Sequence, residues 1–119
     1  TERGVLIEGF GTTHASVYKT IIPVQNTGFF IANKLFYPGD ALTNPGKKVP
    51  ILALPVAGPW IKLSEAIEYA LDIKPAICFP VHDGILKVIG TTNVLPKKIL
   101  TPLGIKFQVL EINIENLLE

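Results

Sequence analysis

The chain has 119 residues, a length that fits one domain at most. Apolar residues make up 48% of it and charged residues only 18%, so a core can form and an intrinsically disordered chain is excluded. Eleven basic and ten acidic side chains leave a net charge of +1, which argues against a nucleic-acid binder or a polybasic membrane binder.

The first elements along the chain are predicted to be short strands separated by turn residues. Residues 5–7 are apolar and run into a Gly-Phe-Gly sequence, which predicts a strand. Residues 17–24 are rich in β-branched and aromatic side chains but contain a proline, which predicts an edge strand or a bulged strand. Residues 28–32 and 35–37 flank an Asn-Lys pair, and they predict a tight hairpin because asparagine tolerates a positive φ.

The middle of the chain predicts a strand, a helix and a second strand. Residues 49–56 are apolar on both faces, as in a buried parallel strand. Apolar side chains then recur at helical spacing from Leu63 to Leu71; Ser64 or a neighbour would cap this helix, and Lys74-Pro75 would end it. The apolar run 76–81 follows, so the two strands should be parallel in a βαβ unit.

The last part of the chain predicts one more helix and one more strand. Residues 94–103 form a possible second helix that two prolines limit, and residues 105–109 alternate between apolar and polar side chains as a strand does. The fold class expected from the whole pattern is α/β, with a mainly β layer and one or two helices.

Location and redox state follow from a few simple features. The longest apolar runs are far shorter than the ~20 residues that a membrane-spanning helix needs, and residues 1–4 lead directly into a strand-like run rather than a signal peptide. The single cysteine, Cys78, excludes an internal disulfide and fits a reducing compartment, so we expect a cytoplasmic protein. Within its apolar strand, Cys78 is expected to be a small core residue.

Three side chains that can bind a metal each follow a predicted strand. His14 comes after the first strand, Asp40 after the second arm of the hairpin, and His82 directly after the run 76–81. If these strands run parallel in one sheet, their carboxyl ends share an edge, which is where α/β sheets bind ligands. Two imidazoles and a carboxylate are suitable ligands for zinc or another first-row metal.

These three residues are part of a longer ordered pattern. The pattern consists of His14-Ala15, Ile22-Pro23, Asn26-Thr27-Gly28-Phe29, Phe36-Tyr37-Pro38-Gly39-Asp40, Leu54-Pro55-Val56, Gly58-Pro59-Trp60, Lys74-Pro75 and Pro80-Val81-His82-Asp83-Gly84. In this order it resembles the C-terminal half of a metallo-β-lactamase-fold hydrolase, of the branch similar to ascorbate-6-phosphate lactonase. The resemblance implies an αββα sandwich, of which residues 1–119 form one half as a single partial domain.

The resemblance also implies roles for the three candidates. His14 is similar to a histidine that binds a first metal, Asp40 to a carboxylate that bridges two metals, and His82 to a histidine that binds the second. The cofactor expected is zinc, with manganese or iron as other possibilities. Such metals lower the pKa of a bound water, and the resulting hydroxide attacks an ester, lactone or phosphoester substrate.

One departure from the family pattern is large. The motif His-x-His-x-Asp-His, which supplies most of the ligands in the N-terminal half of such domains, does not occur in residues 1–119. We therefore expect this chain to have little or no hydrolase activity by itself. Half a sandwich would expose an apolar sheet face and strand edges, so we also expect self-association or pairing with the missing N-terminal half.

Each candidate also has a non-catalytic interpretation. His14 could bond to nearby backbone, Asp40 could be a turn residue after Pro-Gly, and His82 could simply end its strand. Asp83 either orients a metal ligand or is a solvated loop carboxylate. Trp60 either lines the mouth of the pocket or packs in the core. The alternative function is a structural or assembly module that binds no metal.

Overall fold

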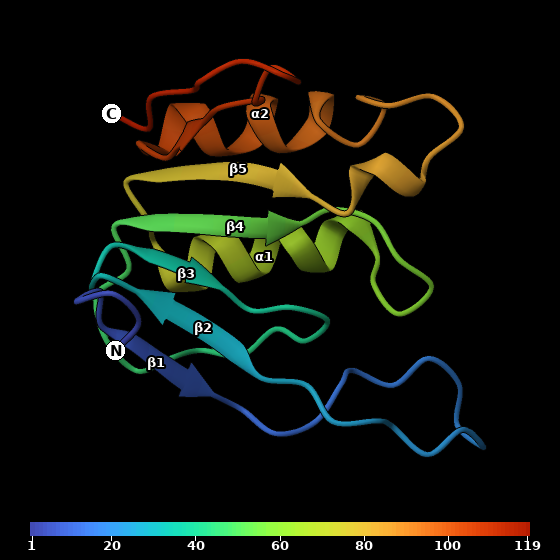
Figure 1. The fold of residues 1–119 in the computed structure, drawn as a ribbon. Coiled ribbons are helices and arrows are strands. Elements are labelled where there is room, and N and C mark those ends of the chain that lie inside the picture. Colours follow the sequence, from blue (N-terminus) through green and yellow to red (C-terminus); the bar gives the residue numbers. More distant parts are fainter.

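A six-stranded mixed sheet organises the computed structural model, which describes residues 1–119 (Figure 1). The strands lie side by side in chain order: β1 (Ile7–Phe10), β2 (Gly28–Ile31), β3 (Leu35–Tyr37), β4 (Ile51–Pro55), β5 (Ile77–Val81) and β6 (Lys106–Phe107). β2 pairs antiparallel with both β1 and β3, whereas β3 to β6 pair parallel with one another. The strands β1, β3, β4 and β5 therefore point the same way, and their carboxyl ends lie at one edge of the sheet (Figure 1).

The predicted hairpin and βαβ unit are both confirmed. Ala32 and Asn33 have φ of +53° and +54°, the positive values that a tight hairpin turn requires. β4 and β5 pair parallel over their whole length, with helix α1 (Leu63–Ile73) between them in the chain. The first strand is also present, but it begins at Ile7 and continues through Gly9 to Phe10 rather than covering residues 5–7.

The strand predicted over residues 17–24 was wrong. The segment consists of turns and bends in a loop that projects away from the sheet (Figure 1). It is tied back by the backbone N–H of His14, which donates to the Val24 carbonyl, and by an isolated bridge between Thr13 and Gln25. Ile22 is 88% exposed. The β-branched side chains of residues 17–24 favour a strand, but no neighbouring strand lies beside them. β propensity reflects packing against neighbouring strands, so it has no effect here.

The predicted helix is α1, which lies behind β4 in Figure 1. Its N-cap is Lys62 rather than Ser64: the Lys62 backbone N–H donates to the Glu65 carboxylate over 2.8 Å, and the Glu65 N–H donates to the Lys62 carbonyl. The helix ends at Lys74, whose φ of +54° is left-handed, and Pro75 follows. The predicted end of this helix is therefore confirmed, and the prediction of a cap at Ser64 or a neighbour is narrowed to Lys62, two residues before Ser64.

The C-terminal elements are shorter than predicted. Residues 94–103 form helix α2 (Val94–Leu100) followed by one 3₁₀ turn, η2 (Thr101–Leu103), because Pro102 cannot donate a backbone hydrogen bond. The last strand is reduced to β6, and a 3₁₀ turn η1 (Asp83–Ile85) follows β5 directly. Neither helix has the length and apolar content that crossing a membrane demands.

One face of the sheet and both helices enclose the core. Phe30, Phe36, Leu52 and Cys78 stand in one cross-strand row, and each is at most 1% exposed. Further members of the same cluster come from β4, β6, α1, α2 and the loops: Val49, Leu54, Val56, Ala66, Ile67, Tyr69, Ala70, Leu100, Ile105 and Phe107. The central strands are therefore held by apolar burial against helices on one side only.

The opposite face of the sheet is apolar and carries no helix. We call it the helix-free face and define it by Ile7, Phe29, Ile31, Leu35, Tyr37, Ile51 and Phe79, which alternate with the core residues along their strands. Phe29 is 43% and Ile7 40% exposed. Ala53 and Ile77 on the same face are buried, so the exposed part lies over β1 and β2. A partly exposed apolar sheet face is what half of a sandwich would present.

We expect the 119-residue chain, studied by itself, to self-associate through the helix-free face. Phe29→Glu puts a charge on that face and should shift the mass measured by light scattering toward the monomer. Leu103→Glu changes a 63% exposed side chain on η2, outside the face, and should leave the mass unaltered. A wild-type chain that stays strictly monomeric at high concentration contradicts this expectation.

The Cys78 thiol should be unreactive in the folded protein. Burial raises its pKa to about 12, so at pH 8 almost none of it is the reactive thiolate, and its side chain is fully enclosed. A thiol reagent is therefore expected to label Cys78 only in denaturant, at the rate at which β5 opens. Rapid labelling in native buffer would show that the core around β5 is not closed.

Candidate metal centre

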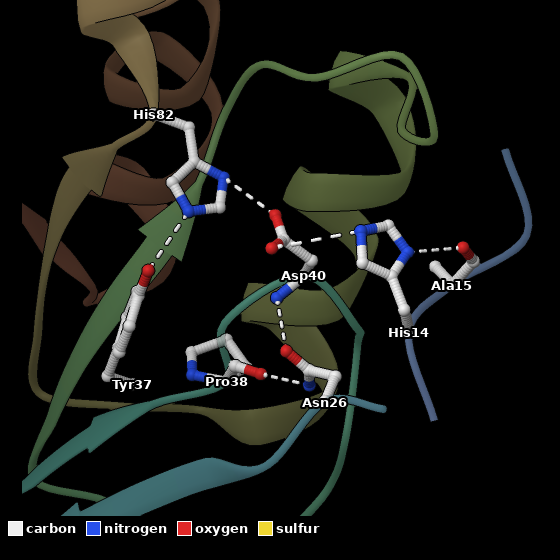
Figure 2. Close-up of polar contacts among 7 residues, drawn as sticks. All are labelled: His14, Ala15, Asn26, Tyr37, Pro38, Asp40 and His82. Atoms are coloured by element: carbon white, nitrogen blue, oxygen red, sulfur yellow. Dashed lines mark hydrogen bonds and ion pairs between the residues drawn. The ribbon is translucent and has the colours of Figure 1, made fainter. Parts of the chain in front are cut away.

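The carboxyl ends of β1, β3 and β5 bring His14, Asp40 and His82 together (Figure 2). Asp40 lies between the two imidazoles: its Oδ2 is 3.7 Å from His14 Nε2, and its Oδ1 is 3.7 Å from His82 Nδ1. The histidine side chains are 17% and 20% exposed and that of Asp40 is 45% exposed. The three residues predicted to share an edge do share it; their binding of a metal stays a prediction.

The Pro-Gly turn that presents Asp40 is held by an asparagine. Asn26 Oδ1 accepts the backbone N–H of Asp40 and its Nδ2 donates to the Pro38 carbonyl, each over 3.0 Å. The Ala15 N–H donates to the Asp40 carbonyl over 2.8 Å and so links this turn to the loop of His14. Sequence reasoning gave Asn26 no role, although the Asn-Thr-Gly run that contains it belongs to the family-like pattern.

The tautomer of His14 follows from its backbone contact. Its Nδ1 lies 2.6 Å from the carbonyl oxygen of Ala15. Because a carbonyl only accepts hydrogen bonds, the proton is on Nδ1, and the lone pair is on Nε2, which faces Asp40. The ring also meets the Trp60 indole edge to face, with centroids 6.0 Å apart. The backbone bond that the non-catalytic interpretation expected is present, and it orients the ring as a metal-binding histidine needs.

His82 is held by its backbone and by a tyrosine. Its φ of +70° is in the left-handed region, which is unfavourable for a residue with a Cβ. Its Nε2 lies 3.1 Å from the Tyr37 hydroxyl, and the two rings are perpendicular with centroids 6.2 Å apart. Burial, and then the negative charge of Asp40, raise the pKa of Tyr37, so its hydroxyl stays protonated near neutral pH. Sequence reasoning missed Tyr37, because nothing local connects it to His82.

A pocket of about 260 Å³ opens beside these three residues. Its other walls are Ala57, Gly58, Pro59, Trp60 and Ile85. Trp60 thus lines the pocket, as one of its two interpretations proposed. Asp83 lies at the start of η1, and its side chain makes no hydrogen bond or ion pair, which favours the solvated carboxylate.

The donor set fits part of a divalent-cation site. Each 3.7 Å separation between nitrogen and oxygen is too long for a hydrogen bond. Bonds from Zn²⁺ to nitrogen or oxygen are about 2.1 Å long, so one ion can contact two atoms that are up to about 4.2 Å apart. The nitrogen and oxygen of each pair are closer than this limit, and one ion can therefore contact both. No three His, Cys, Asp or Glu side chains converge on one point in the structure. The chain therefore offers two His–Asp pairs that share Asp40, and a closed site needs further donors.

Comparison with known proteins gives three findings. The family model described as "Beta-lactamase superfamily domain" matches residues 1–82, the segment that contains all three candidate ligands. Protein Rv0786c of Mycobacterium tuberculosis is 35% identical over 85 residues, which cover 67% of this chain and 40% of that protein. The solved structure of Igni18, a metallo hydrolase from the archaeon Ignicoccus hospitalis, matches with a TM-score of 0.63 at 20% identity.

The extent of these matches is unequal. The likeness to Igni18 covers 91% of this chain and 50% of Igni18, and at this identity it shows the fold alone. The chain thus spans half or less of the length of the proteins it matches.

Two glycine variants should separate backbone strain from the support of Asp40. Gly39 and Gly46 have nearly equal φ, +71° and +69°, but an added Cβ at Gly39 meets Asn26 Oδ1, whereas at Gly46 it meets nothing within 4 Å. Gly46→Ala should cost roughly 1–2 kcal/mol in free energy of unfolding, the usual penalty of the left-handed conformation. Gly39→Ala should cost more in chemical denaturation and displace Asp40. Equal losses would show that Asn26 does not hold the turn.

Proposed function

The chain belongs to the beta-lactamase superfamily, and we propose that it supplies part of a metal centre that hydrolyses an ester, lactone or phosphoester bond. The observation that carries this proposal is the placement of Asp40 between two imidazoles. Each imidazole has its outer nitrogen in contact with another group and its inner nitrogen facing the carboxylate.

Each of the three side chains has a distinct part in the proposed centre. His14 and His82 would hold the cation from the two sides of Asp40, each with the ring nitrogen that lies 3.7 Å from an Asp40 oxygen. Asp40 has one oxygen toward each histidine, so it is the group that two cations would share. A divalent cation held there supplies a hydroxide nucleophile near neutral pH. Imidazole and carboxylate suit zinc, with manganese and iron as further candidates.

The pocket walls support a substrate with an apolar part. Ala57, Pro59, Trp60 and Ile85 line the pocket together with the three candidate ligands. These side chains offer no hydrogen bonds to an anionic group apart from the indole N–H of Trp60. They exclude water beside the reacting bond and hold a hydrocarbon portion of the substrate against the site.

The remaining donors of the centre come from outside residues 1–119 in this proposal. The chain spans 40% of Protein Rv0786c and 50% of Igni18, so its relatives have as many residues again beyond the matched part. Two His–Asp pairs leave coordination positions open, as noted above. Hydrolysis is therefore assigned to the full-length protein, and the chain of residues 1–119 is expected to be inactive alone. The cytoplasmic location inferred from Cys78 remains a prediction.

One observation favours an assembly role, which is the alternative function. The helix-free face is apolar and exposes Phe29 and Ile7 by 43% and 40%, and exposed apolar side chains that lie together on a surface often mark an interaction site. The two functions are compatible in one protein, because the face and the site use different residues apart from Tyr37. Metal content distinguishes a working centre from a purely structural module.

We expect the full-length protein encoded by the gene, purified without chelator, to carry about one or two zinc, manganese or iron ions per chain. Asp40→Ala removes the group that faces both histidines and should lower metal affinity by at least ~100-fold, the upper end of losses seen for outer-shell partners. His82→Ala should lose one ion. Asp72→Asn, on α1 beside Asn44, is the matched control and should retain metal. A full-length protein without metal would favour the assembly module.

A further inference from the structure

The loop that follows His14 is apolar and exposed. We call residues 15–25 the apolar loop, because Lys19 is its only charged residue. The loop projects past the carboxyl end of β1 rather than over the helix-free face (Figure 1). Exposed apolar side chains that lie together often mark a binding site. Those of the apolar loop belong to Val17, Tyr18, Ile21, Ile22 and Val24, which are 45–88% exposed.

A hollow of about 110 Å³ lies within the apolar loop and adjoins the pocket of the candidate metal centre. We call it the loop hollow. One of its walls is His14, which also lines the pocket beside Asp40 and His82. Its other walls are all residues of the apolar loop: Ala15, Val17, Ile21, Ile22, Pro23 and Val24. The loop hollow and the pocket therefore meet at a candidate metal ligand.

A third hollow, of about 230 Å³, adjoins both of these spaces. It shares Trp60 with the pocket and Val17 with the loop hollow. Its other walls include the polar side chains of Ser16, Lys62 and Glu65. A hydrocarbon chain that leaves the pocket is therefore better accommodated along His14 into the loop hollow, where the walls are apolar.

Backbone hydrogen bonds hold the apolar loop beside the site. The His14 N–H donates to the Val24 carbonyl over 2.9 Å, and the Ala15 N–H donates to the Asp40 carbonyl over 2.8 Å. The bridge between Thr13 and Gln25 closes the base of the loop. Both arms are thus attached to the segments that carry candidate ligands. A binding surface that is already ordered loses less conformational entropy when a ligand binds.

The side chains that line the two spaces select the chemistry of their occupant. Neither the pocket nor the loop hollow is lined by a lysine or an arginine, the side chains that pair with a phosphate or a carboxylate. An aliphatic chain needs only apolar contacts, and each methylene group that it buries strengthens binding roughly fourfold. The walls therefore favour an aliphatic chain over an anionic group.

We propose that the apolar loop binds the aliphatic acyl chain of an ester or lactone whose reacting bond lies at the candidate metal centre. The first carbons of the chain occupy the pocket, and the rest pass His14 to contact Val17 and Ile21. The inference rests on the proposed function and narrows its substrate class to acyl compounds. Because the loop contacts the chain and not the reacting bond, its residues determine the preference for chain length.

The experiment uses the full-length protein, with sodium butanoate and sodium octanoate as probes in isothermal titration calorimetry. Both probes carry the same carboxylate, so the ratio of their dissociation constants reports the additional methylene groups alone. The wild type should bind octanoate at least about tenfold more tightly than butanoate. Ile21→Gln should reduce this ratio by about three- to tenfold and leave butanoate affinity unchanged. The preference in kcat/KM for 4-nitrophenyl octanoate over the butanoate ester should fall in parallel.

Ile89→Gln is the matched control. Ile89 and Ile21 are both 56% exposed, but Ile89 lies between η1 and α2 and lines a different hollow. Its substitution should leave the ratio unaltered. A wild-type ratio near one, or equal ratios in Ile21→Gln and Ile89→Gln, would overturn the inference.

Two further measurements identify other occupants of the apolar loop. Light scattering reports association with a second copy, and sedimentation with phosphatidylcholine vesicles reports binding to a lipid surface. If Ile21→Gln changes either of these and leaves the ratio unaltered, the loop does not bind an acyl chain and the inference is wrong. The failure of the proposed function is distinguishable: a ratio near one in a metal-containing protein overturns this inference alone, whereas a full-length protein without metal overturns the proposed function.

Discussion

The candidate site depends on the common direction of β1, β3 and β5. Each strand delivers one side chain just past its carboxyl end, so His14, Asp40 and His82 meet although they are far apart in the chain. The antiparallel strand β2 makes this possible, because it reverses the chain between β1 and β3 and returns β3 to the direction of β1. The helix α1 does the same between β4 and β5. Without either reversal, one ligand would lie at the opposite edge.

Rigid contacts outside the three side chains then give the site its shape. Asn26 clamps the turn of Asp40, the Ala15 carbonyl fixes the ring of His14, and Tyr37 fixes the ring of His82. Each contact is a hydrogen bond in a partly buried setting, where its direction is better defined than in water. Asp40 remains the most exposed of the three candidate ligands, which leaves its oxygens accessible from the pocket. The three side chains face one another without forming hydrogen bonds among themselves, so their donor atoms are free to bind a ligand.

The two faces of the sheet have different consequences for function. One face is packed against α1 and α2 and supplies the stability of the chain. The other is apolar, carries no helix, and includes Tyr37, so whatever covers it would lie beside the hydrogen bond that holds His82. Since the chain spans half or less of its matched relatives, covering this face and completing the metal centre are physically linked problems.

The sequence by itself determined the features that depend on neighbours in the chain. Local turn chemistry and periodicity account for a turn at Asn33, which in the structure also includes Ala32, and for the period of α1, its end at Lys74-Pro75 and the parallel pairing of β4 with β5. It also identified the three candidates, because residues after parallel strands share an edge. Tertiary structure alone decided the rest: Asn26 reaches Pro38 across 12 positions, and Tyr37 reaches His82 across 45. It also left residues 17–24 without a strand partner, since side-chain preference cannot supply the neighbour that a strand must pair with.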